Sequence, residues 1–98
     1  MRLLWSKRAL AGLSEIQDYI AADSPERAKA VIERLAERAG TLLQFPHLGR
    51  RVPELRTSGF REFIEGNYRI VYRPAPGSIE IVTVFEGHRL LSADDLAP

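Results

Sequence analysis

The stretch FREFIEGNYRIVYRPAPGSIEIVTVF, residues 60–85, contains three strand-like segments separated by two turns. Phe60–Glu65 and Tyr68–Arg73 flank Gly66-Asn67, a dipeptide that favours a two-residue hairpin turn. A second turn, rich in proline and glycine, leads into Ile79–Phe85. Because Ile79–Phe85 carries apolar residues on both of its faces, we expect it to lie inside a sheet rather than at an edge.

Upstream of this stretch, the apolar residues recur with the period of a helix. Lys7–Ala22 places its apolar side chains on one helical face. A second amphipathic helix is expected from Pro25 to Leu43, because Ser24 offers a capping oxygen and proline suits the first helical turn. The short linker predicts an antiparallel helical hairpin. Leu3–Trp5 is long enough for a brief strand.

These segments predict a single α+β domain over residues 1–98 with the order β-α-α-β-β-β. We expect the helical hairpin to pack on one face of a small, mainly antiparallel sheet. The segment from Phe45 to Gly59 has no periodicity and contains several prolines and glycines, so it is expected to be a loop.

The two-residue turn also predicts which strand residues share a face. It places Ile64 opposite Arg69 and Glu62 opposite Val71. Arg69 and Arg73 are then expected on the side away from the helices, exposed beside Glu62. The opposite face is expected to pack under the helices and carries Arg61, Phe63, Tyr68, Ile70 and Tyr72.

Composition excludes several classes of function. The chain has 98 residues, no cysteine and two histidines, which excludes a disulfide framework, thiolate metal sites and cysteine nucleophiles. We expect no metal and no cofactor. The sequence shows neither a signal peptide nor an apolar segment of membrane-spanning length, so a cytoplasmic protein without membrane contact is expected.

The formal net charge of +1 conceals an uneven distribution. Residues 1–46 carry seven basic and six acidic side chains, residues 47–73 six and three, and residues 74–98 one and four. Arginine suits the bidentate recognition of phosphate or carboxylate, so the basic middle segment is a candidate surface for a polyanionic target. Alternatively, Glu62 forms cross-strand ion pairs with Arg69 and Arg73, which contribute little when exposed.

Few catalytic patterns are present. The sequence contains no GxGxxG, Walker A, HExxH, GxSxG or zinc-binding pattern. His88 follows the strongest predicted strand and could titrate near neutrality, although a surface histidine at a strand end is an equal alternative. Glu54 is a candidate general acid or base, or an ordinary solvated loop residue.

The chain also carries an ordered set of short motifs. They are Trp5 followed by Ala9, Ile16–Ile20, Ser24-Pro25 with Ala28, Phe45–Arg50, Val52–Glu54, Arg61-Glu62, Tyr68–Arg73 and His88-Arg89. As a set, covering nearly the whole chain, they resemble the RelE/ParE superfamily of bacterial type II toxins. The helical hairpin and the Phe-Pro-x-x-Gly-Arg loop look more like the ParE branch.

The resemblance implies a toxin that is neutralised in a hetero-oligomer by a cognate antitoxin. The antitoxin would be ParD-like, with a ribbon-helix-helix domain, and encoded in the same operon. ParE-like members act in plasmid stabilisation and inhibit DNA gyrase by binding, without enzymatic activity. The alternatives are a RelE-like, ribosome-dependent mRNA endoribonuclease and a member that has lost toxicity and only binds its antitoxin.

The resemblance assigns different residues to the two activities. Under the nuclease alternative, Glu54 lies where some members place a general base, Arg69 where they place a phosphate-stabilising arginine, and His88 near their terminal acid. The lysines of a RelE site and the aromatic residue after the last strand are absent. Under the gyrase interpretation, the target-binding residues are Arg50, Arg51, Arg61, Arg69, Arg73 and Arg89.

Overall fold

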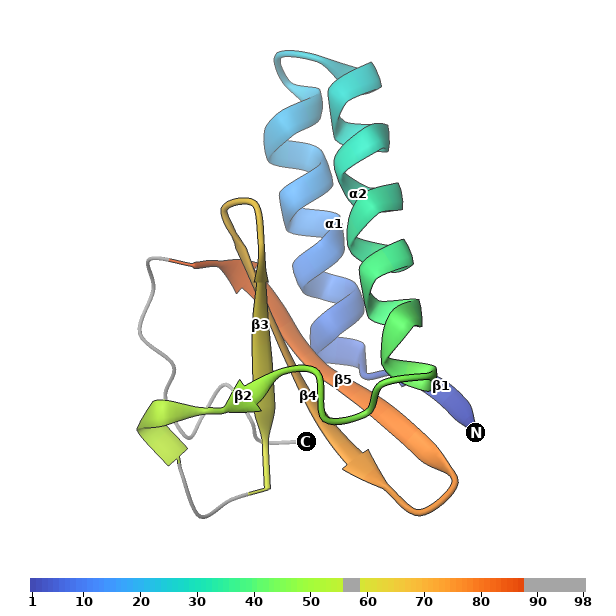
Figure 1. Cartoon of the computed structure of the whole chain (residues 1–98). Coiled ribbons are helices and arrows are strands. Elements are labelled where there is room, and N and C mark those ends of the chain that lie inside the picture. The colour runs from blue at the N-terminus through green and yellow to red at the C-terminus, as the bar shows by residue number, and fades with distance from the viewer. Residues whose placement is uncertain (56–58, 88–98) are drawn as a thin grey trace.

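A computed structural model of the chain describes residues 1–55 and 59–87 (Figure 1). Its elements are β1 (Arg2–Trp5), α1 (Lys7–Ala21), α2 (Pro25–Gly40), the 3-10 helix η1 (Thr41–Leu43), β2 (Arg50–Arg51), the 3-10 helix η2 (Pro53–Leu55), β3 (Arg61–Glu65), β4 (Tyr68–Ala75) and β5 (Ser78–Glu86). Within these residues, no helix combines the length and apolarity needed to cross a membrane.

The strands form one sheet in the order β1-β5-β4-β3-β2. β1 runs parallel to β5, and all other neighbours are antiparallel, which confirms the expected α+β fold with a mainly antiparallel sheet. β5 lies between β1 and β4, so its predicted inner position is also confirmed. The interpretation of residues 45–59 as loop alone was wrong, because this segment contributes the edge strand β2 and the helix η2.

The two helices lie side by side as the predicted antiparallel hairpin (Figure 1). The Ser24 hydroxyl caps α2 by accepting a hydrogen bond from the Arg27 N–H. Ser6 caps α1 in the same way through the Ala9 N–H and also donates to the Val82 carbonyl at 2.7 Å, so the cap fastens the helix to β5.

A glycine sets the distance between α1 and β5. A Cβ atom at Gly12 would lie 2.2 Å from the Val84 carbonyl oxygen, which is closer than any side chain can approach. The main core lies between the helices and the sheet, and its largest buried side chains include Leu35, Ile70 and Tyr72. The helical hairpin therefore covers one face of the sheet, as expected.

The strand register agrees with the prediction. Ile64 lies opposite Arg69, and Glu62 lies opposite Val71. The sheet face away from the helices is nevertheless not open. A second apolar cluster lies there, formed by Val52, Val71 and Phe85 with Leu55 and Phe60 packed against it. The segment that contains β2 and η2 thus covers this face and buries what the sequence predicted to be exposed.

Candidate functional site

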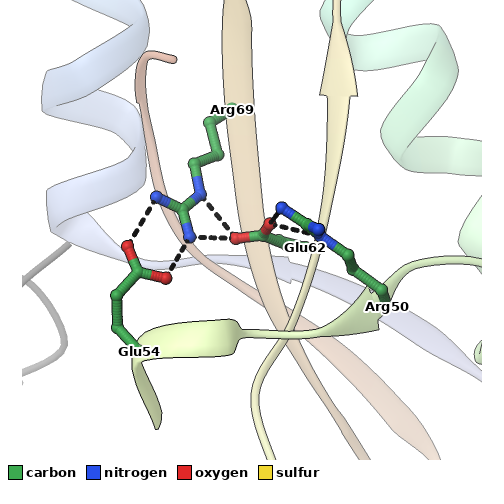
Figure 2. Close-up of polar contacts among 4 residues, drawn as sticks. All are labelled: Arg50, Glu54, Glu62 and Arg69. Atoms are coloured by element: carbon green, nitrogen blue, oxygen red, sulfur yellow. Dashed lines mark hydrogen bonds and ion pairs between the residues drawn. The ribbon is translucent and has the colours of Figure 1, made fainter. Parts of the chain in front are cut away.

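Four charged side chains from four elements meet on the face away from the helices. Arg50 comes from β2, Glu54 from η2, Glu62 from β3 and Arg69 from β4 (Figure 2). The expectation that Arg69 is exposed beside Glu62 was wrong: Arg69 is 6% and Glu62 is 1% exposed. The physical reason is the cover of β2 and η2, which brings Val52 and Leu55 over this face.

The four side chains alternate in charge along a row (Figure 2). Arg69 Nη1 and Nη2 donate to the two carboxylate oxygens of Glu54 at 2.9 and 2.7 Å. Arg69 Nε and Nη2 contact Glu62 Oε1. The other oxygen of Glu62 accepts from Arg50 Nε at 2.8 Å. With two acids and two bases, the row is neutral overall.

The Arg69 guanidinium is therefore committed to protein partners. All three of its nitrogens contact carboxylates, and its carbon Cζ lies 5.7 Å from the centre of the Phe85 ring. The hydrogen bonding that Arg69 donates to Glu54 is the main cause that raises the pKa of Arg69. Burial lowers this pKa, and the contacts with the Glu62 carboxylate raise it. In this arrangement the pair Glu54 and Arg69 ties η2 to the sheet.

Two hydrogen bonds of Tyr72 hold the loop before β2 in place. The Tyr72 hydroxyl donates to the Pro46 carbonyl at 2.8 Å and accepts from the Gly49 N–H at 2.9 Å. Gly49 must be a glycine, because a Cβ atom there would lie 2.4 Å from the Glu62 carbonyl oxygen. Burial raises the pKa of the Tyr72 phenol, while the Gly49 hydrogen bond and Arg61 act in the opposite direction.

Two arginines lie directly opposite each other at the edge of the sheet. Arg51 in β2 pairs with Arg61 in β3, so their side chains lie on the same face of the sheet. Arg61 Nη1 donates to the Gly49 carbonyl at 2.7 Å, and Arg51 is exposed. Across residues 1–55 and 59–87, neither arginine forms an ion pair with a carboxylate. Like charges directly opposite are unfavourable, so this doublet favours an anionic ligand.

The remaining predicted residues differ in their environment. Arg50 exposes 69% of its side chain although it pairs with Glu62. Arg73 is exposed, pairs with Glu80 at 3.0 Å and lies over the ring of Phe60. The candidates His88 and Arg89 lie outside the described residues. The structure thus brings together Glu54 and Arg69, the two residues that the nuclease alternative assigns to one site. In this structure, however, the two side chains form an ion pair with each other.

The sequence did not predict that Tyr72 and Gly49 hold the loop before β2. It also did not predict that Glu62 lies at the centre of the charged row. One signal was present. Val71 and Phe85 place apolar side chains on the face away from the helices, and such side chains require a cover.

Comparisons with known proteins place the chain in a family. The family described as the ParE toxin of the type II toxin-antitoxin system, parDE, matches residues 3–91. Toxin RelE2 of Caulobacter vibrioides is 37% identical over 90 residues, which cover 91% of this chain and 98% of that protein. The structure titled "Chromosomal ParDE TA system from P. aeruginosa" matches with a TM-score of 0.72 and 25% identity over 88% of this chain and 95% of that chain.

The family match covers residues 3–91, and the structural match covers 88% of the chain. The chain therefore belongs to the ParE toxin family, within the RelE/ParE superfamily of type II toxins.

Proposed function

We propose that this protein inhibits DNA gyrase by binding to it, as the toxin of a type II toxin-antitoxin pair. The observation that carries the proposal is the pairing of Glu54 with Arg69. A general base must be free to take a proton, and a phosphate-stabilising arginine must be free to meet the phosphate. Here each of the two groups holds the other, so the pair supports a structural role rather than bond cleavage.

The surface proposed to contact the target is the doublet Arg51 and Arg61. These two arginines lack a carboxylate partner within the described residues, and the Tyr72 hydroxyl and the Glu62 carboxylate fix the loop and strand that carry them. A rigid surface loses little conformational entropy on binding. Arg50 and Arg73 are also exposed, but they are paired with carboxylates and their side chains lie on the opposite face of the sheet. The partners of Arg51 and Arg61 would be DNA phosphates or an acidic surface of gyrase.

A cognate antitoxin is the second proposed partner. The structure from P. aeruginosa is titled as a ParDE system, which supports a ParD-like antitoxin for this chain and a hetero-oligomeric complex. Gyrase as the target would place the action of the protein in the cytoplasm.

The ribosome-dependent mRNA endoribonuclease is the second candidate. The name of the relative RelE2 favours it, as does the proximity of Glu54 and Arg69. That activity requires the two side chains to separate when RNA binds, and it requires His88 as the acid.

Parallel assays with purified protein separate the two candidates. We expect the wild type to stall supercoiling by gyrase and to accumulate linear DNA, and to leave mRNA intact on translating ribosomes. Arg51→Glu should abolish the effect on gyrase, because it reverses one charge of the doublet. Arg2→Glu is the matched control: Arg2 is also exposed on an edge strand, but at the opposite edge of the sheet. Normal supercoiling at excess wild-type protein, with mRNA cut on ribosomes, would contradict the proposal.

A further inference from the structure

A groove lies between the helical hairpin and the turn that joins β3 to β4. Tyr19 and Ile20 line it from α1, and Gly66 and Asn67 line it from the turn. Tyr19 is 80% exposed, although its ring is large and mostly apolar. This groove lies at the end of β3 opposite to Arg61, so it is separate from the proposed target surface.

The α2 wall of the groove carries two arginines and one apolar residue between them. Arg27, Val31 and Arg34 follow one another at intervals of four and three residues, so they share one helical face. Seven residues of helix separate the two arginines by about 10 Å along the axis. Val31 is half-buried, whereas both arginines are exposed.

Neither arginine has a carboxylate partner within the described part of the chain, and no acidic residue lines the groove. Arg38, one turn further along the same face, shows the contrast. It pairs with Glu65 at 2.8 Å and lies over the ring of Phe63. The chain thus neutralises the arginine that packs on its own sheet and leaves positive the two that face the groove.

We propose that this groove receives an acidic segment of the antitoxin. The segment would place two carboxylates about 10 Å apart, on Arg27 and Arg34, which corresponds to two turns of helix or three residues of extended chain. An apolar side chain between them would pack on Val31 and Ile20, with the exposed Tyr19 ring at the rim. The inference rests on the proposed function, because the partner is the antitoxin.

The test measures the affinity of the full chain for the purified product of the adjoining antitoxin gene. Arg27→Glu combined with Arg34→Glu should weaken binding by about tenfold or more at low salt and by less at high salt, because the lost contacts are electrostatic. Arg8→Glu combined with Lys29→Glu is the matched control. It changes the charge by the same amount on exposed helix positions outside this groove and should leave the affinity unchanged.

Two further variants keep the test independent of folding. Arg27→Gln combined with Arg34→Gln should weaken binding to a smaller extent. Lysine substitutions of the matching acidic residues in the antitoxin should restore its affinity for the Arg27→Glu, Arg34→Glu protein. If the wild type and the Arg27→Glu, Arg34→Glu protein bind the antitoxin with equal affinity, the inference is overturned but the proposed function is not. The same holds if the double variant loses only its binding to a DNA duplex probe. A wild-type protein that does not bind the antitoxin would overturn the proposed function as well.

Discussion

The face of the sheet that α1 and α2 cover buries apolar side chains such as Ile70, whereas the opposite face buries Val71 together with the charged groups of Glu62 and Arg69. The difference follows from the size of the cover. Two helices supply enough apolar surface to exclude water, but the segment that contains β2 and η2 supplies little more than Val52 and Leu55. Charged groups trapped under such a small cover must satisfy one another, because burying an unpaired charge is costly.

This comparison separates the arginines into two groups. Arg69 is neutralised by carboxylates and stabilises the fold. Arg51 and Arg61 at the sheet edge, and Arg27 and Arg34 at the groove, have no such partner among the described residues, and they are the ones for which we propose ligands.

The largest effect is expected from Glu62→Ala. The substitution leaves the buried Arg69 without its Nε partner and removes the partner of Arg50. Removing one member of a buried ion pair costs about 3 kcal/mol of unfolding free energy. Urea denaturation measures this loss. A loss below about 1 kcal/mol, the range of exposed pairs, would mean that the charged row contributes little to stability.

On the helix-covered face, Gly12→Ala should lower the unfolding free energy by about 2 kcal/mol, because the new Cβ atom forces α1 away from the Val84 carbonyl. Gly40→Ala is the control. No heavy atom lies within 4 Å of a Cβ atom placed there, so this substitution should be neutral or slightly stabilising. Equal thermal stability of the two variants would show that the approach of α1 to β5 is not limited by glycine.

Tyr72→Phe should cost about 1–2 kcal/mol, because the Pro46 carbonyl and the Gly49 N–H lose their partner. It should also change the response to alkaline pH. Since burial raises the pKa of the folded phenol, its contribution is fully present below the ordinary value of about 10 and is lost as the pH rises through the folded value. Urea denaturation across this pH range should therefore show that the unfolding free energy falls less steeply with pH for Tyr72→Phe than for the wild type. An equally steep fall in both proteins would contradict the role given to the buried Tyr72 phenol.

The smallest effect is expected from Glu80→Ala. Its ion pair with Arg73 is exposed, so its removal should cost less than about 1 kcal/mol, and the cost should fall further at high salt. A cost comparable to that of Glu62→Ala would remove the distinction between buried and exposed pairs.

The sequence predicted the fold where the periodicity was strong. It placed the two helices, the inner position of β5 and the pairing of Glu62 with Val71, because each follows from a local pattern of two or 3.6 residues. It did not predict the cover on the second face. Arg50–Arg51 is too short to show alternation, and the burial of Arg69 depends on residues distant in the sequence. The apolar residues on both faces of β5, which predicted its inner position, also require that both faces of the sheet be covered. Phe85 was the residue that indicated a cover on the face away from the helices.

The most direct test compares Glu54→Gln with Arg51→Glu in cells that express the toxin without antitoxin, with thermal unfolding of each purified variant as the check on folding. Glu54 exposes 27% of its side chain, and Arg69 keeps its contact with Glu62, so Glu54→Gln should remain folded. We predict that Glu54→Gln still arrests growth and that Arg51→Glu, equally folded, does not. A folded but harmless Glu54→Gln beside a fully toxic Arg51→Glu would contradict the account and assign the activity to the buried pair.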